Sequence, residues 1–224
     1  KNFEHVVVVV NPRDYAGVLK ALQENALSKE KRMELALKAF AQTACFDAGV
    51  HAFFASELKQ DFPDKLITCF SKTQDLRYGE NPHQRAALYS DGSNGFASLA
   101  GKQLSYNNVL DADADHALAK EFRGEKAAII IKHFNPCGGT TGKTLREAFE
   151  KALATDPLSA YGGIIAFTQK VDEDTAHALA DQFIEVILAP GYDKKAFEIL
   201  SEKKNRRILD STELMNSQKA KEIR

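Results

Sequence analysis

The sequence has no tryptophan, two methionines and only three cysteines among its 224 residues. Cys45, Cys69 and Cys137 form no C-x-x-C pair, and an odd number at wide spacing is typical of reduced cytoplasmic thiols rather than of a disulfide framework. The formal net charge is −1, so the chain as a whole is not expected to attract nucleic acid. No apolar run approaches the roughly 20 residues that a membrane-spanning helix needs, so no membrane association is expected either.

The first residues lack both a methionine and the hydrophobic region of a signal peptide. Lys1-Asn2-Phe3 is followed almost at once by five consecutive valines, Val6–Val10. A continuous run of β-branched residues predicts a strand buried on both faces, as in a parallel sheet. A core strand so close to the first residue leads us to expect a fragment of a longer protein.

Two domains are predicted, with a boundary where the helical periodicity stops. An amphipathic pattern begins after Ser28, a predicted N-cap, and runs to Leu58. It breaks at Phe62-Pro63-Asp64, which is a turn signal. We therefore predict that residues 1–72 are the tail of a doubly wound α/β domain with its linker, and that residues 73–224 begin a second domain.

Strands and helices alternate through the second domain, which predicts a layered α/β architecture. The expected strands are 127–131, 163–167, 186–189 and one near Ile208, and the expected helices are 111–122, 144–153, 172–183 and 196–200.

The most informative motif follows the apolar strand 127–131 and reads Lys-His-Phe-Asn-Pro-Cys-Gly-Gly. Side chains alternate along a strand, so Lys132 and His133 can serve one pocket only if the strand ends before them. Pro136 favours such an ending, and Gly138 and Gly139 would let the backbone approach a ligand closely. The run therefore predicts a proton-transfer pair beside a turn, although a Lys and a His that merely close a strand are also common.

Two further runs carry few residues that could fill a core. Leu76–Gln84 reads LRYGENPHQ, and Asp156–Phe167 reads DPLSAYGGIIAF. Together with the Lys-His run and in the same order, they resemble the bifunctional purine-biosynthesis family. Its members combine aminoimidazole carboxamide ribonucleotide (AICAR) transformylase with inosine monophosphate (IMP) cyclohydrolase. The resemblance covers essentially the whole chain but not the whole family protein.

The resemblance implies formyl transfer from 10-formyltetrahydrofolate, the cosubstrate, to AICAR, followed by cyclisation of formyl-AICAR to IMP, with no metal required for the chemistry. It also implies a cytoplasmic homodimer whose transformylase site is shared across the interface. Residues 1–72 would be the C-terminal part of the methylglyoxal-synthase-like cyclohydrolase domain. Residues 73–224 would be the N-terminal part of a cytidine-deaminase-like α/β transformylase domain.

The family's functional residues map onto matching positions of this sequence. Catalytic roles are implied for Lys132, His133 and Lys1, the last in the cyclohydrolase domain, and substrate-binding roles for Arg77, Tyr78, Asn108, Gly162 and Glu185. Asn108 also looks like a helix cap, and Glu185 could be a polar residue at the edge of a strand.

The chemistry of the pair fits formyl transfer to a weakly nucleophilic amine. A histidine can relay a proton near neutral pH, and a neighbouring ammonium disfavours the imidazolium, so His133 is expected to be able to accept a proton. The ammonium of Lys132 can stabilise the oxyanion of a tetrahedral intermediate.

Three alternatives remain open at this point. Gly142-Lys143-Thr144 resembles the end of a nucleotide-binding P-loop, but Cys137 stands where that motif needs glycine. Pro136-Cys137 resembles part of a zinc deaminase signature, but Thr140 stands where its second cysteine should be, so metal ligation is not expected. The chain could also be an inactive fragment, because the family's folate contacts and a later catalytic asparagine lie outside it.

Overall fold

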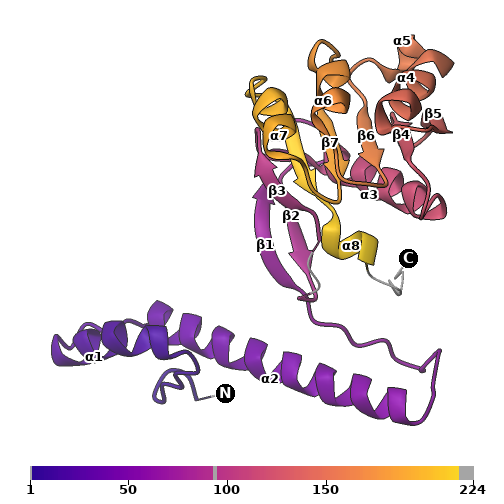
Figure 1. The fold of residues 1–224 in the computed structure, drawn as a ribbon. Helices are drawn as coiled ribbons and strands as arrows, with labels where there is room; N and C mark the ends of the chain where they lie inside the picture. Colours follow the sequence, from indigo (N-terminus) through magenta and orange to yellow (C-terminus); the bar gives the residue numbers. More distant parts are fainter. Residues whose placement is uncertain (1, 93–94, 217–224) are drawn as a thin grey trace. The chain divides into compact units, whose positions relative to one another are not determined.

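The structure is a computed structural model that describes residues 2–92 and 95–216. The chain divides into two compact units, Lys1–Ser71 and Lys72–Arg224. Figure 1 shows that the first unit is helical and that the second is built around a β-sheet. Each unit is described by itself.

The first unit contains a 3-10 turn and two α-helices. These are η1 (Pro12–Asp14), α1 (Tyr15–Gln23) and α2 (Lys29–Glu57). Ser28 is the N-cap of α2, as predicted, and its side chain accepts a hydrogen bond from the backbone N–H of Lys31 at 3.2 Å. No helix in the described residues is long and apolar enough to cross a membrane.

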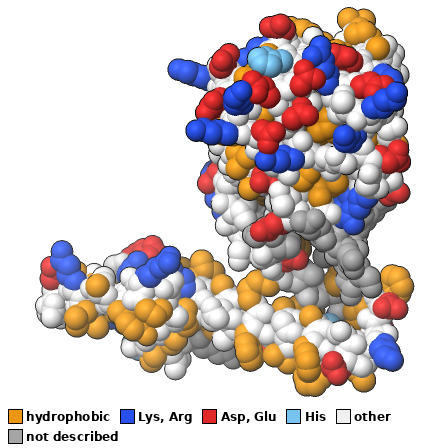
Figure 2. Space-filling view, in the orientation of Figure 1, with side chains coloured by type: hydrophobic (Ala, Val, Ile, Leu, Met, Phe, Trp, Pro, Cys, Tyr) orange, Lys and Arg blue, Asp and Glu red, His pale blue; other side chains and the backbone are white. Residues whose placement is uncertain are grey.

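Much of the apolar surface of this unit is exposed. Only Leu35 and Ala48 are buried along the 29 residues of α2. Phe40, Phe46 and Phe53 are each at least 60% exposed, and hydrophobic side chains are visible along this unit in Figure 2. Internal packing therefore accounts for few of the apolar residues that the sequence supplies here.

Two predictions for the first unit are wrong. Val6–Val10 belongs to no strand, and Val6 and Val8 are each more than half exposed. An apolar run becomes a strand only when another backbone pairs with it, and the described residues supply no such partner. Cys45 and Cys69 form a disulfide with their Cα atoms 5.3 Å apart, so the expectation of reduced thiols also fails.

The second unit contains a two-stranded sheet and a mixed six-stranded sheet. The first pairs β1 (Ser71–Leu76) with β2 (Ala86–Ser90), and the second has the order β3-β8-β7-β6-β4-β5. The strands of the larger sheet are β3 (Ala97–Ala100), β4 (Ala127–Ile131), β5 (Pro136–Thr141), β6 (Ile164–Phe167), β7 (Val186–Ala189) and β8 (Arg207–Asp210). β6, β7 and β8 run parallel, whereas β4 is antiparallel to β5 and β6, and β3 is antiparallel to β8.

Helices cover both faces of the larger sheet. The helices of this unit are α3 (Tyr106–Glu121), α4 (Leu145–Thr155), α5 (Pro157–Ala160), α6 (Glu173–Ala180), α7 (Lys194–Ser201) and α8 (Thr212–Asn216). Alternate residues face opposite layers, so Ile130 and Ile165 pack in the core with α4, α6 and α7, whereas Ile129 and Ile164 pack in the core with α3. The predicted α/β class is correct, and continuous apolar runs correctly marked strands buried on both faces.

The glycine-rich run after the Lys-His pair is a strand rather than an open turn. Pro136–Thr141 forms β5 and pairs with β4, and the turn is confined to the residues between the two strands. β5 lies at the edge of the sheet, where a proline is tolerated because one side of the strand needs no ladder hydrogen bond. A Cβ at Gly138 would collide with the backbone carbonyl of Ala152 in α4. Gly138 therefore permits close packing of strand and helix, whereas its close approach to a ligand stays a prediction.

Candidate functional site

One end of the larger sheet gathers polar residues from three strands, β4, β7 and β8. The register pairs Ile131 with Ile164, Ile164 with Val186, and Val186 with Arg207. The residues just beyond this row, Lys132 after β4 and Glu185 before β7, therefore lie at the same edge.

A pocket of about 260 Å³ opens at this edge. It is lined by most of the residues singled out in the sequence, namely Tyr78, Asn108, Lys132, His133, Gly162 and Glu185. Arg77 lines a neighbouring cavity of about 400 Å³, which shares Phe183 and Glu185 with the pocket. Lys1 lies outside the described residues.

Lys132 and His133 line the pocket together because β4 ends at Ile131. The backbone N–H of Lys132 donates to the carbonyl of Asn135 at 2.9 Å, and the Asn135 side-chain amide donates to the carbonyl of His133 at 3.0 Å. These bonds form a tight turn in which the alternation of a strand no longer applies. The Lys132 ammonium donates to the backbone carbonyl of Tyr161, which holds it at the pocket wall.

Asp111 contacts the same turn from α3. Its Oδ1 atom accepts the backbone N–H of Phe134 at 2.7 Å, and its side chain lines the pocket. Burial raises the pKa of the Asp111 carboxyl above its ordinary value, while the Phe134 N–H and nearby His133 act in the opposite direction.

Asn108 belongs to both a helix cap and the pocket. Ser105 is the N-cap of α3, and its Oγ accepts the Asn108 backbone N–H at 3.3 Å. Asn108 Oδ1 accepts the Ser105 backbone N–H at 3.1 Å, which completes a reciprocal capping box. The remaining side-chain nitrogen, Nδ2, donates to Glu185 Oε2 at 3.3 Å. The capping box thus orients the side-chain amide of Asn108, with Nδ2 directed toward Glu185.

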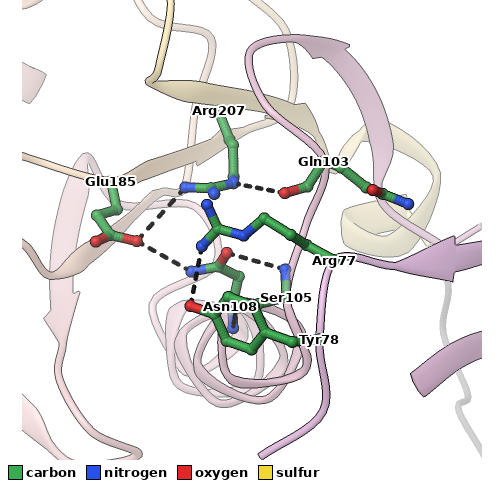
Figure 3. A network of polar contacts seen from close by, with 7 residues as sticks. All are labelled: Arg77, Tyr78, Gln103, Ser105, Asn108, Glu185 and Arg207. Atoms are coloured by element: carbon green, nitrogen blue, oxygen red, sulfur yellow. Dashed lines mark hydrogen bonds and ion pairs between the residues drawn. The ribbon is translucent and has the colours of Figure 1, made fainter. Parts of the chain in front are cut away.

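Glu185 is held by two donors from different elements (Figure 3). Its Oε2 accepts from Asn108 Nδ2 and lies 3.4 Å from Arg207 Nη1. The Arg207 side chain is only 4% exposed, and its Nε donates to the carbonyl of Gln103 at 3.3 Å. Glu185 is therefore a positioned carboxylate rather than a free polar residue at a strand edge.

Arg77 and Tyr78 interact with each other as well as with the backbone. Arg77 Nη2 donates to the Tyr78 hydroxyl at 2.9 Å, and the guanidinium carbon lies 4.7 Å from the centre of the Tyr78 ring. The segment is anchored because the Arg77 N–H donates to Leu104 O and the Tyr106 N–H donates to Tyr78 O. The cavity beside Arg77 is rich in cations, with Lys102, Lys203 and Lys204 in its lining.

Gly162 closes the pocket in a conformation that favours glycine. Its φ is +74°, and its N–H donates to the carbonyl of Phe183 at 2.7 Å. A Cβ there would lie 3.0 Å from Cε1 of Phe183 and 3.8 Å from Nζ of Lys132.

Several residues that build this site were not predicted from the sequence. Ser105, Asp111, Tyr161 and Phe183 line the pocket, and Arg207 holds Glu185. The S-x-x-N spacing of the capping box could have identified Ser105, and Tyr161 belongs to the run Asp156–Phe167. Asp111, Phe183 and Arg207 have no local signal.

Two observations on the described residues concern the thiol of Cys137 and groups of potential metal ligands. Burial raises the pKa of the Cys137 thiol, which disfavours the reactive thiolate. Within residues 2–92 and 95–216, no three His, Cys, Asp or Glu side chains are grouped as metal ligands would be.

Comparison with known proteins gives a consistent set of relatives. A family model described as AICARFT/IMPCHase bienzyme matches residues 1–224. The bifunctional purine biosynthesis protein PurH of Halalkalibacterium halodurans is 46% identical over 93% of this chain and 42% of its own length. The proteins of the same name from Myxococcus xanthus and Bacillus subtilis are 45% and 42% identical over 99% and 100% of this chain, and each is covered over 45% of its length. The chain thus spans somewhat less than half of these relatives.

Similarity to solved structures is low. The dCMP deaminase from the cyanophage S-TIM5 gives a TM-score of 0.36 at 10% identity, covering 45% of this chain and 94% of that one.

Proposed function

Because the chain belongs to the AICARFT/IMPCHase bienzyme family, we propose that it carries the nucleotide side of a site that transfers a formyl group to AICAR. We further propose that these residues function within a protein of its relatives' length, called the full-length protein below. The observation that supports this most strongly is the shared pocket of Lys132, His133, Asn108 and Glu185.

The proposed reaction uses 10-formyltetrahydrofolate as cosubstrate and no metal. The amine nitrogen of AICAR attacks the formyl carbon, a new N–C bond forms, and the bond from that carbon to N10 of the folate breaks. The proton lost by the amine passes to His133 and returns to N10 as the leaving group departs. Lys132 stabilises the oxyanion on the formyl oxygen, and its bond to the Tyr161 carbonyl holds it ready for that role.

The nucleotide would be bound by the remaining pocket residues. We propose that Arg77 contacts its phosphate, because a guanidinium suits a phosphate and this one borders a cavity rich in cations. Tyr78 would lie against the base or ribose. Asn108, Glu185 and the backbone at Gly162 would bind further polar groups of the nucleotide, with Glu185 already oriented by Arg207.

The first unit has a separate proposed role. Residues 1–72 would be the C-terminal part of a methylglyoxal-synthase-like cyclohydrolase domain, with Lys1 as one of its catalytic residues, and residues 73–224 would begin a cytidine-deaminase-like transformylase domain. The full-length protein would be a homodimer that shares the transformylase site across its interface. A cytoplasmic location now rests on this metabolic role, because the disulfide between Cys45 and Cys69 removes the argument from cysteine spacing.

A P-loop is not supported by the structure. The residues in which its phosphate loop would begin form β5, and Gly138 packs against α4. A non-catalytic fragment is therefore the second candidate, and activity measurements distinguish it.

The test is the variant His133→Ala in the full-length protein. We expect the turnover number for formyl transfer to fall by about 10²-fold or more, the usual scale for a general acid–base group. Lys132→Met should impair the same step. Cyclisation of pre-formed formyl-AICAR should be spared, because we assign it to the other domain. His177→Ala, an exposed histidine on α6, is the matched control. Near-normal transfer in His133→Ala would remove His133 from the mechanism.

A further inference from the structure

The turn that carries Lys132 and His133 contains an unfavourable backbone conformation. Phe134 has φ +63°, in the left-handed region that side chains other than glycine rarely adopt. The residue is 61% exposed, so burial of the ring in a core does not explain the conformation. Something else in the site must hold the backbone at this residue.

The hydrogen bonds within the turn shape it but do not attach it to the rest of the fold. They join Lys132 to Asn135 and Asn135 to His133. Two contacts attach it: the Lys132 ammonium donates to the carbonyl of Tyr161, and Asp111 Oδ1 accepts the Phe134 N–H at 2.7 Å. Only the second acts on the backbone of the turn.

Asp111 is well suited to act as an anchor. It is only 9% exposed and lies in the second turn of α3, three residues after Asn108 of the capping box. Two small residues of that helix, Ala112 and Ala119, pack in the core formed with β4, β6 and β7. The carboxylate is therefore fixed relative to the strand from which the turn emerges.

We propose that Asp111 is a positioning residue: by holding the left-handed backbone of Phe134, it keeps both Lys132 and His133 facing the pocket. This inference rests on the proposed function for its kinetic consequences. Asp111 is not proposed to transfer a proton. Its proposed effect depends on the hydrogen bond to the Phe134 backbone and not on the charge of the carboxylate near His133.

Substitutions at two positions separate these roles. Asp111→Asn keeps a hydrogen-bond acceptor of the same shape but removes the charge, whereas Asp111→Ala removes both. Phe134→Gly allows the left-handed conformation even when the hydrogen bond to Asp111 is absent. Phe134→Ala also removes the ring but keeps the energetic cost of that conformation. Asp113→Ala, an exposed carboxylate on the same helix, is the matched control.

We expect Asp111→Ala to lower the turnover number for formyl transfer by roughly 30-fold and to change the KM for AICAR less. Asp111→Asn should stay within about fivefold of the unsubstituted protein, because it can still accept the Phe134 N–H. The double variant Asp111→Ala/Phe134→Gly should be about 5- to 30-fold faster than Asp111→Ala/Phe134→Ala, the scale of the left-handed penalty. Equal losses in Asp111→Asn and Asp111→Ala, or no gain from the glycine, would overturn the proposal.

A second measurement needs no activity. Exchange of the Phe134 amide hydrogen, followed by NMR without substrate, should be slow in the unsubstituted protein and in Asp111→Asn but fast in Asp111→Ala. Fast exchange in all three would refute the anchor. Absence of formyl transfer in the unsubstituted full-length protein would instead refute the proposed function. Amide exchange would still decide whether Asp111 holds the Phe134 backbone. Thermal melting of each variant identifies any loss of turnover that is caused by unfolding. If Asp111→Ala does not fold, the comparison of Asp111→Asn with the unsubstituted protein decides the outcome, because asparagine has the same shape as aspartate.

Discussion

The substitution Gly162→Ala is expected to lower both the stability of the fold and the affinity of the pocket for AICAR, and a control variant can distinguish the two effects. The residue adopts φ +74°, and an alanine held there costs about 1–2 kcal/mol relative to glycine. The new methyl group would lie 3.0 Å from Cε1 of Phe183, so that ring must shift by a few tenths of an ångström. Phe183 is 50% exposed and can move, but its ring centre lies 4.8 Å from that of Tyr161, so the wall of the pocket moves with it.

The expected result has two parts. The free energy of unfolding, measured by urea denaturation of the full-length protein, should fall by about 1–2 kcal/mol. The affinity for AICAR, measured by calorimetry, should fall by roughly tenfold, which corresponds to about 1.4 kcal/mol. The second loss arises because the methyl group would lie 3.8 Å from Nζ of Lys132, inside the space that the nucleotide is proposed to fill.

Gly124→Ala is the matched control for this experiment. Gly124 also has a positive φ, +90°, but a Cβ there would meet nothing within 4 Å. It should therefore lose a comparable amount of stability and keep its affinity for AICAR. If Gly124→Ala weakened AICAR binding as much as Gly162→Ala, or if Gly162→Ala left the affinity unchanged, the assignment of this pocket to the nucleotide would be refuted.

Three further predictions concern other parts of the chain. Arg77→Gln should raise the KM for AICAR more than that for the folate, with exposed Arg85→Gln as control, and equal effects on both substrates would indicate general damage to the loop. Burial lowers the pKa of His116 from 6.5 to about 4, so the unfolded state binds more protons between these values and the free energy of unfolding should fall as pH drops through that window, by up to roughly 3 kcal/mol. Urea denaturation at several pH values should show that the free energy of unfolding of His116→Gln falls less over this pH range. An equal fall in both proteins would show that His116 does not cause it. Residues 1–224 alone should aggregate, because the first unit exposes much apolar surface, and should transfer no formyl group, because the family's folate contacts are expected outside them. A monomer that is monodisperse in light scattering and active in the formyl-transfer assay would show that this expectation is wrong.

Local signals in the sequence correctly predicted several strands and helices of the second unit. These elements pack against or pair with other elements of that unit. Val186–Ala189 was predicted with its observed bounds, because four apolar residues buried on both faces mark a parallel strand. Asp172 caps α6 through a hydrogen bond from the Thr175 N–H at 2.8 Å, close to the predicted start of that helix. Such features depend on neighbours along the chain and can be recognised without a structure.

The errors have a common physical origin in pairing contacts that the local composition does not reveal. Val6–Val10 has the composition of a strand but no pairing backbone in the described residues. Pro136–Thr141 has the composition of a turn, yet it pairs with β4 at an edge where proline is tolerated. Cys45 and Cys69 are 24 residues apart, and their spacing alone could not show that the segment after α2 returns close to that helix.

The candidate site combines both kinds of information. Lys132 and His133 could be singled out because their composition is unusual and their run resembles a family motif, and the end of β4 explains how adjacent residues can line one pocket. Glu185 could be named in the same way, but its orientation depends on Arg207, which follows it by 22 residues, and on Asn108, which precedes it by 77. A motif therefore identifies which groups can react, whereas their direction is set by partners such as Arg207 and Asp111 that only the folded chain reveals. For this reason, substitutions at those partners test the site more sharply than further substitutions within the motif.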